Sequence, residues 1–143
     1  MTDSSMLPFD ETLRPSVVFL RCPIRASLDV LGRKWTFLIL YSMAFLKAHR
    51  FVEIRRYIPE LTPRTLSKRL QQLEQAGFIE KVEERRSPRT VRWVLTEMGR
   101  DTIPILIRRI QHSSKWQAGR LFADKVPRAL REIFPVTMQR YAD

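Results

Sequence analysis

The chain has 143 residues, 44% of them hydrophobic, and a formal net charge of +11, which suits one compact domain with a helical extension. The basic excess favours a polyanionic partner, nucleic acid first and an anionic membrane surface second. The chain has one cysteine, so it can form no internal disulfide, which fits a cytoplasmic protein. Its longest apolar run covers residues 36–46 and is too short to cross a bilayer, so no membrane partner is expected.

The N-terminal third begins with an arm and continues into two helices. Residues 1–21 form the expected arm, whose apolar run Val17–Leu20 is suited to packing against a partner chain. Pro23 begins a short helix that Gly32 ends. The apolar stretch from Trp35 to Leu46 is too long for a typical core strand, so it predicts a buried helix with Trp35 in the core.

Two further helices joined by a tight turn predict a helix-turn-helix. Phe51, Ile54 and Ile58 are spaced for one face of a helix over residues 51–58, and residues 59–61 form the connector. In this motif the first helix lies over the DNA backbone and the second enters the major groove.

The second of these helices, residues 63–76, has two chemically different faces. Thr62 is a good N-cap, Pro63 suits the first helical position and Gly77 is a good C-terminal stop. Three leucines share the buried face. The other face is basic and rich in amides, and the residues expected to read bases there are Arg64, Thr65, Ser67, Lys68 and Gln71. The competing interpretation is an ordinary solvated face, with Thr65 and Ser67 bonded within the helix.

The segment after Gly77 predicts a two-stranded wing over residues 79–95. Its first strand ends near Arg85, residues 86–89 form the turn, and Thr90–Leu95 is the second strand. The residues expected to contact phosphates are Arg50, Arg55, Arg69, Arg86, Arg89 and Arg92. If a dimer neutralises about eight phosphates, log K falls with log salt at a slope of about −7. For Arg55 and Arg69, an ion pair with Glu53 or Glu74 is the alternative.

The C-terminal part predicts two more helices. Thr96 caps a helix from Glu97 to about Gly119, with a kink or late start at Pro104, and Pro127 begins a final short helix that Pro135 ends. The apolar stripe of the longer helix exceeds what a small winged domain needs, so a dimer interface is expected. The alternative is that these helices fold back on their own domain.

Several spaced motifs, in order, resemble the HxlR-type winged helix-turn-helix transcription regulators. They cover about Cys22 to Leu106. The matching positions are Cys22-Pro23, Leu31-Gly32-Arg33-Lys34-Trp35, Ile39-Leu40, Arg50-Phe51, Glu53-Ile54-Arg55-Arg56, Ile58-Pro59, Leu66, Leu70, Leu73-Glu74, Gly77-Phe78-Ile79, Pro88-Arg89, Trp93 (more often Tyr in the family) and Leu95-Thr96-Glu97-Met98-Gly99-Arg100.

The resemblance implies a mainly helical protein with a small β-wing that binds DNA as a homodimer. Its expected parts are an N-terminal arm (1–21), a winged helix-turn-helix domain (22–110) and a C-terminal helical extension for dimerisation (111–143). The expected partner is a double-stranded palindromic operator, with helix 63–76 in the major groove and the wing on the backbone or minor groove. The sequence leaves open whether a small molecule or an oxidant acts as an effector. The tail after Trp116 is longer than the family's minimal pattern.

Cys22 is a candidate redox sensor. It precedes Pro23 at an expected helix N-terminus, with Arg21 and Arg25 beside it, and both the helix dipole and nearby cations favour a thiolate. The resemblance adds that some family members sense oxidants or electrophiles with a cysteine here. The alternative is a small hydrophobe packed under the arm.

Other functions are less supported by the sequence. His49 and His112 lack partners at metal spacing, so no metal site or cofactor is expected. No catalytic triad, phosphate-binding glycine loop or paired-carboxylate site is recognisable, so an enzyme is not expected. Two alternatives remain: an architectural protein that coats DNA with little sequence preference, and a winged helix that binds only proteins.

Overall fold

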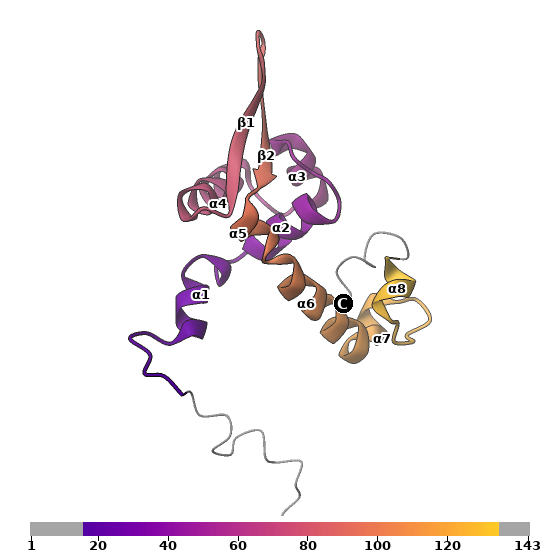
Figure 1. Ribbon diagram of the computed structural model, residues 1–143. Coiled ribbons are helices and arrows are strands. Elements are labelled where there is room, and N and C mark those ends of the chain that lie inside the picture. The colour runs from indigo at the N-terminus through magenta and orange to yellow at the C-terminus, as the bar shows by residue number, and fades with distance from the viewer. Residues whose placement is uncertain (1–15, 135–143) are drawn as a thin grey trace, which may run out of the picture.

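The computed structural model describes residues 16–134 as eight helices and one two-stranded antiparallel sheet (Figure 1). The helices are α1 (Pro23–Leu31), α2 (Thr36–Ala44), α3 (Phe51–Tyr57), α4 (Pro63–Ala76), α5 (Glu97–Arg100), α6 (Ile103–Trp116), α7 (Ala118–Leu121) and α8 (Leu130–Ile133). The strands are β1 (Ile79–Arg86) and β2 (Arg89–Leu95). The expected class, mainly helical with a β-wing, is confirmed. Residues 1–15 of the expected arm, and Pro135 as the end of the last helix, lie outside the described residues.

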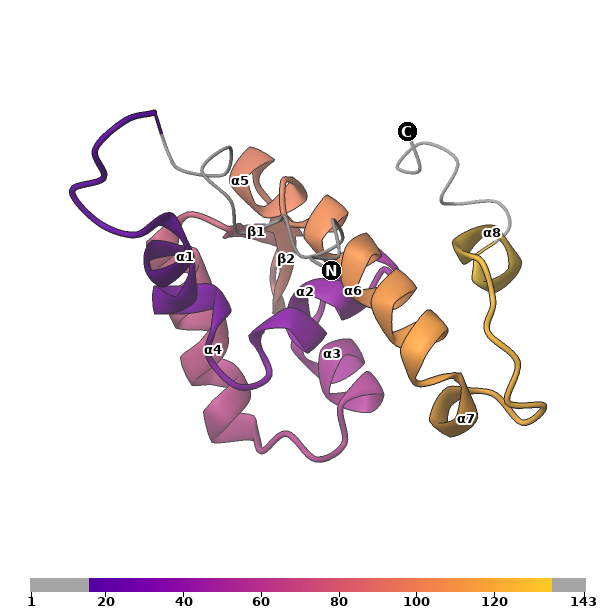
Figure 2. The same cartoon turned by 90° about the horizontal axis from the view of Figure 1, so that it is seen from below.

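The main core lies among α2, α3, α4 and the base of the wing. Ile39 and Leu40 of α2, Ile54 of α3 and Leu66 of α4 are completely buried. Figure 2 shows α2 near the centre of the molecule, with α3 and α4 on one side and α6 on the other. Burial of this many aliphatic side chains fixes α4 to the rest of the domain.

Local signals set both ends of α4. The Thr62 hydroxyl accepts a hydrogen bond from the Thr65 amide at 3.2 Å, and Pro63 occupies the first turn. Gly77 takes a left-handed φ of 91°, and the Phe78 amide donates to the Leu73 carbonyl at 2.9 Å. The helix predicted over residues 63–76 is therefore confirmed at both ends.

The helix predicted from Trp35 to Leu46 is shorter than expected. Trp35 has a φ of 77°, in the left-handed region, so α2 begins at Thr36 and ends at Ala44. The Trp35 ring packs against the main core, and the Lys34 ammonium lies 4.8 Å from its centroid. Trp35 thus packs against the core as expected, but it is only partly buried and its backbone belongs to the turn between α1 and α2.

The wing pairs from Ile79 opposite Leu95 to Arg86 opposite Arg89, which leaves only Ser87 and Pro88 in the turn. The expected turn of four residues is therefore too long, and the Ser87–Pro88 bond is cis. A β-bulge interrupts the register between Glu83 and Arg85. At its base the wing is held by the Trp93 amide, which donates to the His49 carbonyl at 2.7 Å.

The C-terminal helix predicted over residues 97–119 is instead three helices. Thr96 caps α5 as expected, since its hydroxyl accepts from the Gly99 amide at 3.2 Å. The Thr102 hydroxyl then donates to the Gly99 carbonyl at 2.6 Å, and Pro104, which lacks an amide hydrogen, lies in the first turn of α6. The prediction of a continuous helix is wrong, and its alternative of a late start near Pro104 describes α6.

The last helix also starts later than expected. Pro127 was expected to begin it, but α8 begins at Leu130. The Asp124 carboxylate holds the preceding segment in a turn, because it accepts from the Val126 amide at 3.2 Å and pairs with Arg128. These bonds also hold the pKa of Asp124 at about 2.

The apolar stripe of α6 is buried within its own chain. Ile103 and Ile107 form a second core with Leu130 of α8, and Leu106 joins the main core. These side chains therefore fold back on their own domain, as the alternative expectation has it, and do not form the expected dimer interface. Between residues 16 and 134, no helix is both long and apolar enough to cross a membrane.

Candidate nucleic-acid interface

The exposed face of α4 carries four of the five residues expected to read bases. Arg64, Ser67, Lys68 and Gln71 are exposed side by side along the helix. Thr65 is half-buried, and its hydroxyl accepts a hydrogen bond from the Thr62 hydroxyl at 2.9 Å. Thr65 therefore has a structural role in the cap, and its hydroxyl hydrogen and methyl group remain for a base.

The electrostatics of this face suit an anion. The first turn of α4 contains no acid, so its free amides and the positive end of the helix dipole meet no negative side chain of that turn. The only acid within Pro63–Ala76 is Glu74, near the opposite end. Arg and Lys suit guanine O6 and N7, and Gln suits adenine.

Arg55 and Arg69 are bound to backbone rather than left free for phosphate. The Arg69 Nε donates to the Lys34 carbonyl at 2.8 Å, and one Nη donates to the Gln72 side chain at 3.1 Å. The Arg55 Nε lies 3.5 Å from the Leu61 carbonyl, across the turn before α4. The alternative ion pairs with Glu53 and Glu74 do not occur among residues 16–134. Both arginines brace α4 and its turn.

A charge cluster forms where the wing meets the N-terminus of α3. The Arg50 guanidinium lies 2.6 Å from the Glu84 carboxylate, and Arg92 Nε lies 3.9 Å from its other oxygen. Glu84 is the extra residue of the β-bulge, and bulges commonly re-aim a side chain. Two expected phosphate-binding arginines are thus held by one carboxylate.

The tip of the wing gathers the remaining arginines. Arg85, Arg86 and Arg89 are exposed, and Arg86 lies directly opposite Arg89 in the strand register. Like charges placed opposite each other destabilise a sheet unless an anion lies between them. The tip therefore suits a phosphate.

Sequence reasoning missed Glu84, an acid that contacts two arginines of the site. The signal was present, because Glu83 and Glu84 are adjacent acids inside a run that is otherwise rich in arginine. Finding its partners required the bulge, since Glu84 lies 34 residues from Arg50 in the sequence.

Cys22 is exposed at the N-terminus of α1. Its carbonyl accepts the Ala26 amide at 3.0 Å in the first turn. Arg21, expected to support a thiolate, instead forms a two-bond pair with Asp29, each bond 2.7 Å long. This pairing lowers the pKa of the Asp29 carboxyl, mainly through the hydrogen bond.

Metal-binding side chains are scattered in the part of the chain that the structure describes. No three His, Cys, Asp or Glu residues of this part lie close enough together to hold a metal ion. The His49 Nδ1 lies 3.1 Å from the Trp93 carbonyl, so this histidine fastens the wing.

A family model described as HxlR-like helix-turn-helix matches residues 30–120. A Bacillus subtilis protein named uncharacterized HTH-type transcriptional regulator YdeP is 33% identical over 108 residues, covering 76% of this chain and 79% of the relative. A Methanothermobacter thermautotrophicus HTH-type regulator is 38% identical over 85 residues, which are 59% of this chain and 64% of the relative.

Solved structures agree with the sequence relatives. The redox regulator HypR in its oxidised form has a TM-score of 0.60 and 34% identity, over 66% of this chain and 96% of that chain. The reduced form of the regulator YodB from B. subtilis has a TM-score of 0.56 and 26% identity, over 68% of this chain and 95% of that one. None of these relatives carries the name of an enzyme. The chain belongs to the HxlR-like helix-turn-helix family.

Proposed function

We propose that this protein is a cytoplasmic, sequence-specific transcription regulator that binds a palindromic DNA operator as a homodimer. The observation that carries the proposal is the exposed face of α4, where Arg64, Ser67, Lys68 and Gln71 stand on a helix whose other face is completely buried. A rigid helix with a basic, hydrogen-bonding face suits the major groove. The arginines at the wing tip would then meet the backbone or the minor groove.

A homodimer is supported by exposed apolar side chains at the start of the described chain. Val18 and Leu20 are almost fully exposed in the arm, and Ile24 and Leu28 of α1 are more than half exposed. Ile24 and Leu28 are one turn apart on α1, so they share an exposed apolar face, and a second copy with the same face would form a two-fold interface. Substitution Ile24→Asp should convert the dimer to a monomer in analytical ultracentrifugation.

Selection of bound sequences from random duplex DNA tests the function at near-physiological salt. A palindromic consensus with half-sites about one helical turn apart is expected. Binding without any enriched sequence would instead favour the architectural alternative, which the net charge of +11 supports. No binding of DNA at all would contradict both proposals.

Substitutions on α4 separate the base-reading face from general charge. The double variant Arg64→Ala/Lys68→Ala should lose at least about tenfold in operator affinity, because each base contact contributes about 1–3 kcal/mol of discrimination. Arg120→Ala/Lys125→Ala is the matched control, since it also removes two positive charges from exposed side chains, and α7 and the segment after it lie far from α4 in both views (Figures 1 and 2). Equal losses in the two proteins would indicate charge alone.

The carboxylate of Glu84 should restrain binding to DNA of any sequence. Glu84→Gln frees Arg50 and Arg92 for phosphates, so non-specific affinity should rise about threefold and the log–log salt slope should steepen by about one per phosphate gained. Glu83→Gln removes the same charge from the adjacent position and serves as the control. Weaker binding by Glu84→Gln would mean that Glu84 positions these arginines for DNA.

We further propose that oxidation of Cys22 changes DNA binding. Its thiol is exposed at a helix N-terminus, and two similar solved structures are a redox regulator and its reduced form. Because each chain holds one cysteine, a disulfide would join two chains, with diamide taking up the two protons and two electrons released. Diamide should shift DNA affinity in the natural protein and leave Cys22→Ser unchanged, with a cross-linked dimer on non-reducing gels. An identical response of both proteins would exclude Cys22.

A further inference from the structure

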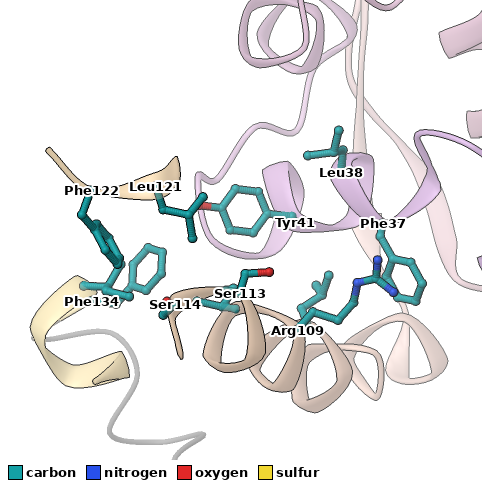
Figure 3. Close-up of a pocket in the computed structure, with 12 residues that line it drawn as sticks. Phe37, Leu38, Tyr41, Arg109, Ser113, Ser114, Leu121, Phe122 and Phe134 are labelled. Atoms are coloured by element: carbon teal, nitrogen blue, oxygen red, sulfur yellow. The ribbon is translucent and has the colours of Figure 1, made fainter. Parts of the chain in front are cut away.

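A cavity of about 460 Å³ lies between α2 and α6, is bordered by α7 and α8, and is largely open to solvent. Figure 3 shows Phe122 and Phe134 at one end, Arg109 beside Phe37 at the other, and Tyr41 and Ser113 between them. The volume is within the range of small-molecule pockets, which combine apolar walls with a few polar groups. The site is separate from the exposed face of α4.

The walls of the cavity are suited to an aromatic ring. Phe37 and Tyr41 come from successive turns of α2, and Phe122 and Phe134 come from the segments that follow α7 and α8. The Tyr41 ring stacks on Phe45 at 5.2 Å, and Phe45 lies 5.6 Å from Phe134, so the aromatic side chains support one another. Stacked and tilted ring pairs at these separations are favourable.

The polar groups of the cavity favour an anion. Arg109 is the only charged residue of its lining among residues 16–134, and no acid lines it there. The Arg109 side chain is exposed, and its guanidinium lies 4.7 Å from the centroid of Phe37, a contact that favours this position at the end of the cavity. The Tyr41 phenol is a neutral hydrogen-bond donor at neutral pH, and burial raises its pKa further from neutrality. Ser113 adds a hydroxyl.

We propose that this cavity binds a small aromatic carboxylate, with its ring between Tyr41 and Phe122 and its carboxylate at Arg109. A planar guanidinium pairs with a carboxylate through two parallel hydrogen bonds, which suits Arg109. A neutral apolar molecule would fill the walls but leave the guanidinium without an anion.

The position of the cavity gives the ligand a route to DNA. One face of α2 lines the cavity, while Ile39 and Leu40 on the same helix belong to the core beneath α4. Occupancy would fix α6, α7 and α8 relative to α2. This second step rests on the proposed DNA-binding function, and a typical coupling changes affinity about 5-fold to 150-fold.

Titration calorimetry without DNA tests the binding site, with 2-naphthoate as the probe and 2-naphthamide as its uncharged counterpart. The natural protein should bind naphthoate at least about tenfold more tightly than naphthamide. Arg109→Gln should abolish this preference. Arg108→Gln is the matched control, because Arg108 is the exposed neighbour on α6, bonds to Gln111 and does not line the cavity.

A second variant blocks the space rather than the charge. Ser113→Phe should weaken both probes, and a thermal melt shows whether it is folded. Equal naphthoate affinity in Arg109→Gln and Arg108→Gln, or no saturable binding by the natural protein, would overturn the proposal. The latter result would also be expected if another segment of protein fills the cavity.

The DNA step is measured separately. Naphthoate at a concentration that just saturates Arg108→Gln should change its operator affinity, and the same concentration should change that of the weaker-binding Arg109→Gln much less. If no DNA binds in either condition, the proposed function fails while the calorimetry still decides the ligand site. Naphthoate binding with unchanged operator affinity would overturn the coupling.

Discussion

The half of the molecule that presents α4 and the half built on α6, α7 and α8 are packed differently. Around α4, the side chains of Ile39, Leu40, Leu66 and Leu73 have no exposed surface. In the C-terminal half the second core rests on three buried residues that keep 4–7% exposure, and a cavity lies beside them. One half holds a surface rigidly in place, and the other retains space that can be filled. Four substitutions test this difference.

Leu66→Ala should have the largest effect. Leu66 is completely buried under the exposed face of α4, so its removal leaves a void that close-packed neighbours cannot fill. We expect the free energy of unfolding to fall by about 4 kcal/mol, measured by guanidinium titration. A loss below about 1 kcal/mol would mean that this half is as loosely packed as the other.

Gly99→Ala should be nearly as destabilising. A Cβ on Gly99 would overlap the Phe78 carbonyl oxygen, which is rigid backbone at the base of the wing. We expect a loss of about 3 kcal/mol, because a well-packed site must shift to accept the methyl group. The measurement is the same titration, with far-ultraviolet circular dichroism to verify that the variant folds. Unchanged stability would show that the junction between wing and α5 is adaptable.

Leu130→Ala should cost less than Leu66→Ala, about 2 kcal/mol, although the chemical change is identical. Leu130 lies in a helix of four residues beside the cavity, where neighbours can relax into the space left behind. The folded variant should keep its operator affinity, because Leu130 belongs to the second core and not to the core beneath α4. A cost equal to that of Leu66→Ala would remove the contrast between the two halves.

Gly119→Ala should have the smallest effect and the opposite sign. A Cβ there meets nothing within 4 Å, and alanine restricts the unfolded chain more than glycine does. We expect stability to rise by about 0.5 kcal/mol, visible as a small upward shift of the thermal midpoint. Destabilisation would mean that α7 is more tightly packed than the structure indicates.

The same contrast separates what could be predicted from the sequence from what could not. Both ends of α4 were predicted because Thr62, Pro63 and Gly77 act on their own neighbours. The division of the C-terminal helix depended on which atom the Thr102 hydroxyl would bond, and the start of α8 depended on the pairing of Asp124 with Arg128. Neither of these side-chain bonds can be predicted from the spacing of hydrophobic residues.

The candidate site also has a part that could be predicted from the sequence and a part that could not. The exposed positions on α4 follow from helical spacing alone, so Arg64, Lys68 and Gln71 were predictable. Which arginines stay free was not, because that depends on contacts between distant segments. Arg69 reaches a carbonyl 35 residues earlier in the sequence, and Arg50 reaches an acid 34 residues later.

Under the proposed function, the bond from Arg69 to the Lys34 carbonyl has a practical consequence for engineering the DNA sequence that α4 would recognise. It assigns Arg69, although charged, to the group of residues that fasten α4, together with its partner Gln72. A library that seeks new operators can therefore randomise positions 64, 67, 68 and 71 alone. Positions 66, 69, 70, 72 and 73 should be kept constant, because their side chains hold α4 in place while the randomised positions change its recognition surface.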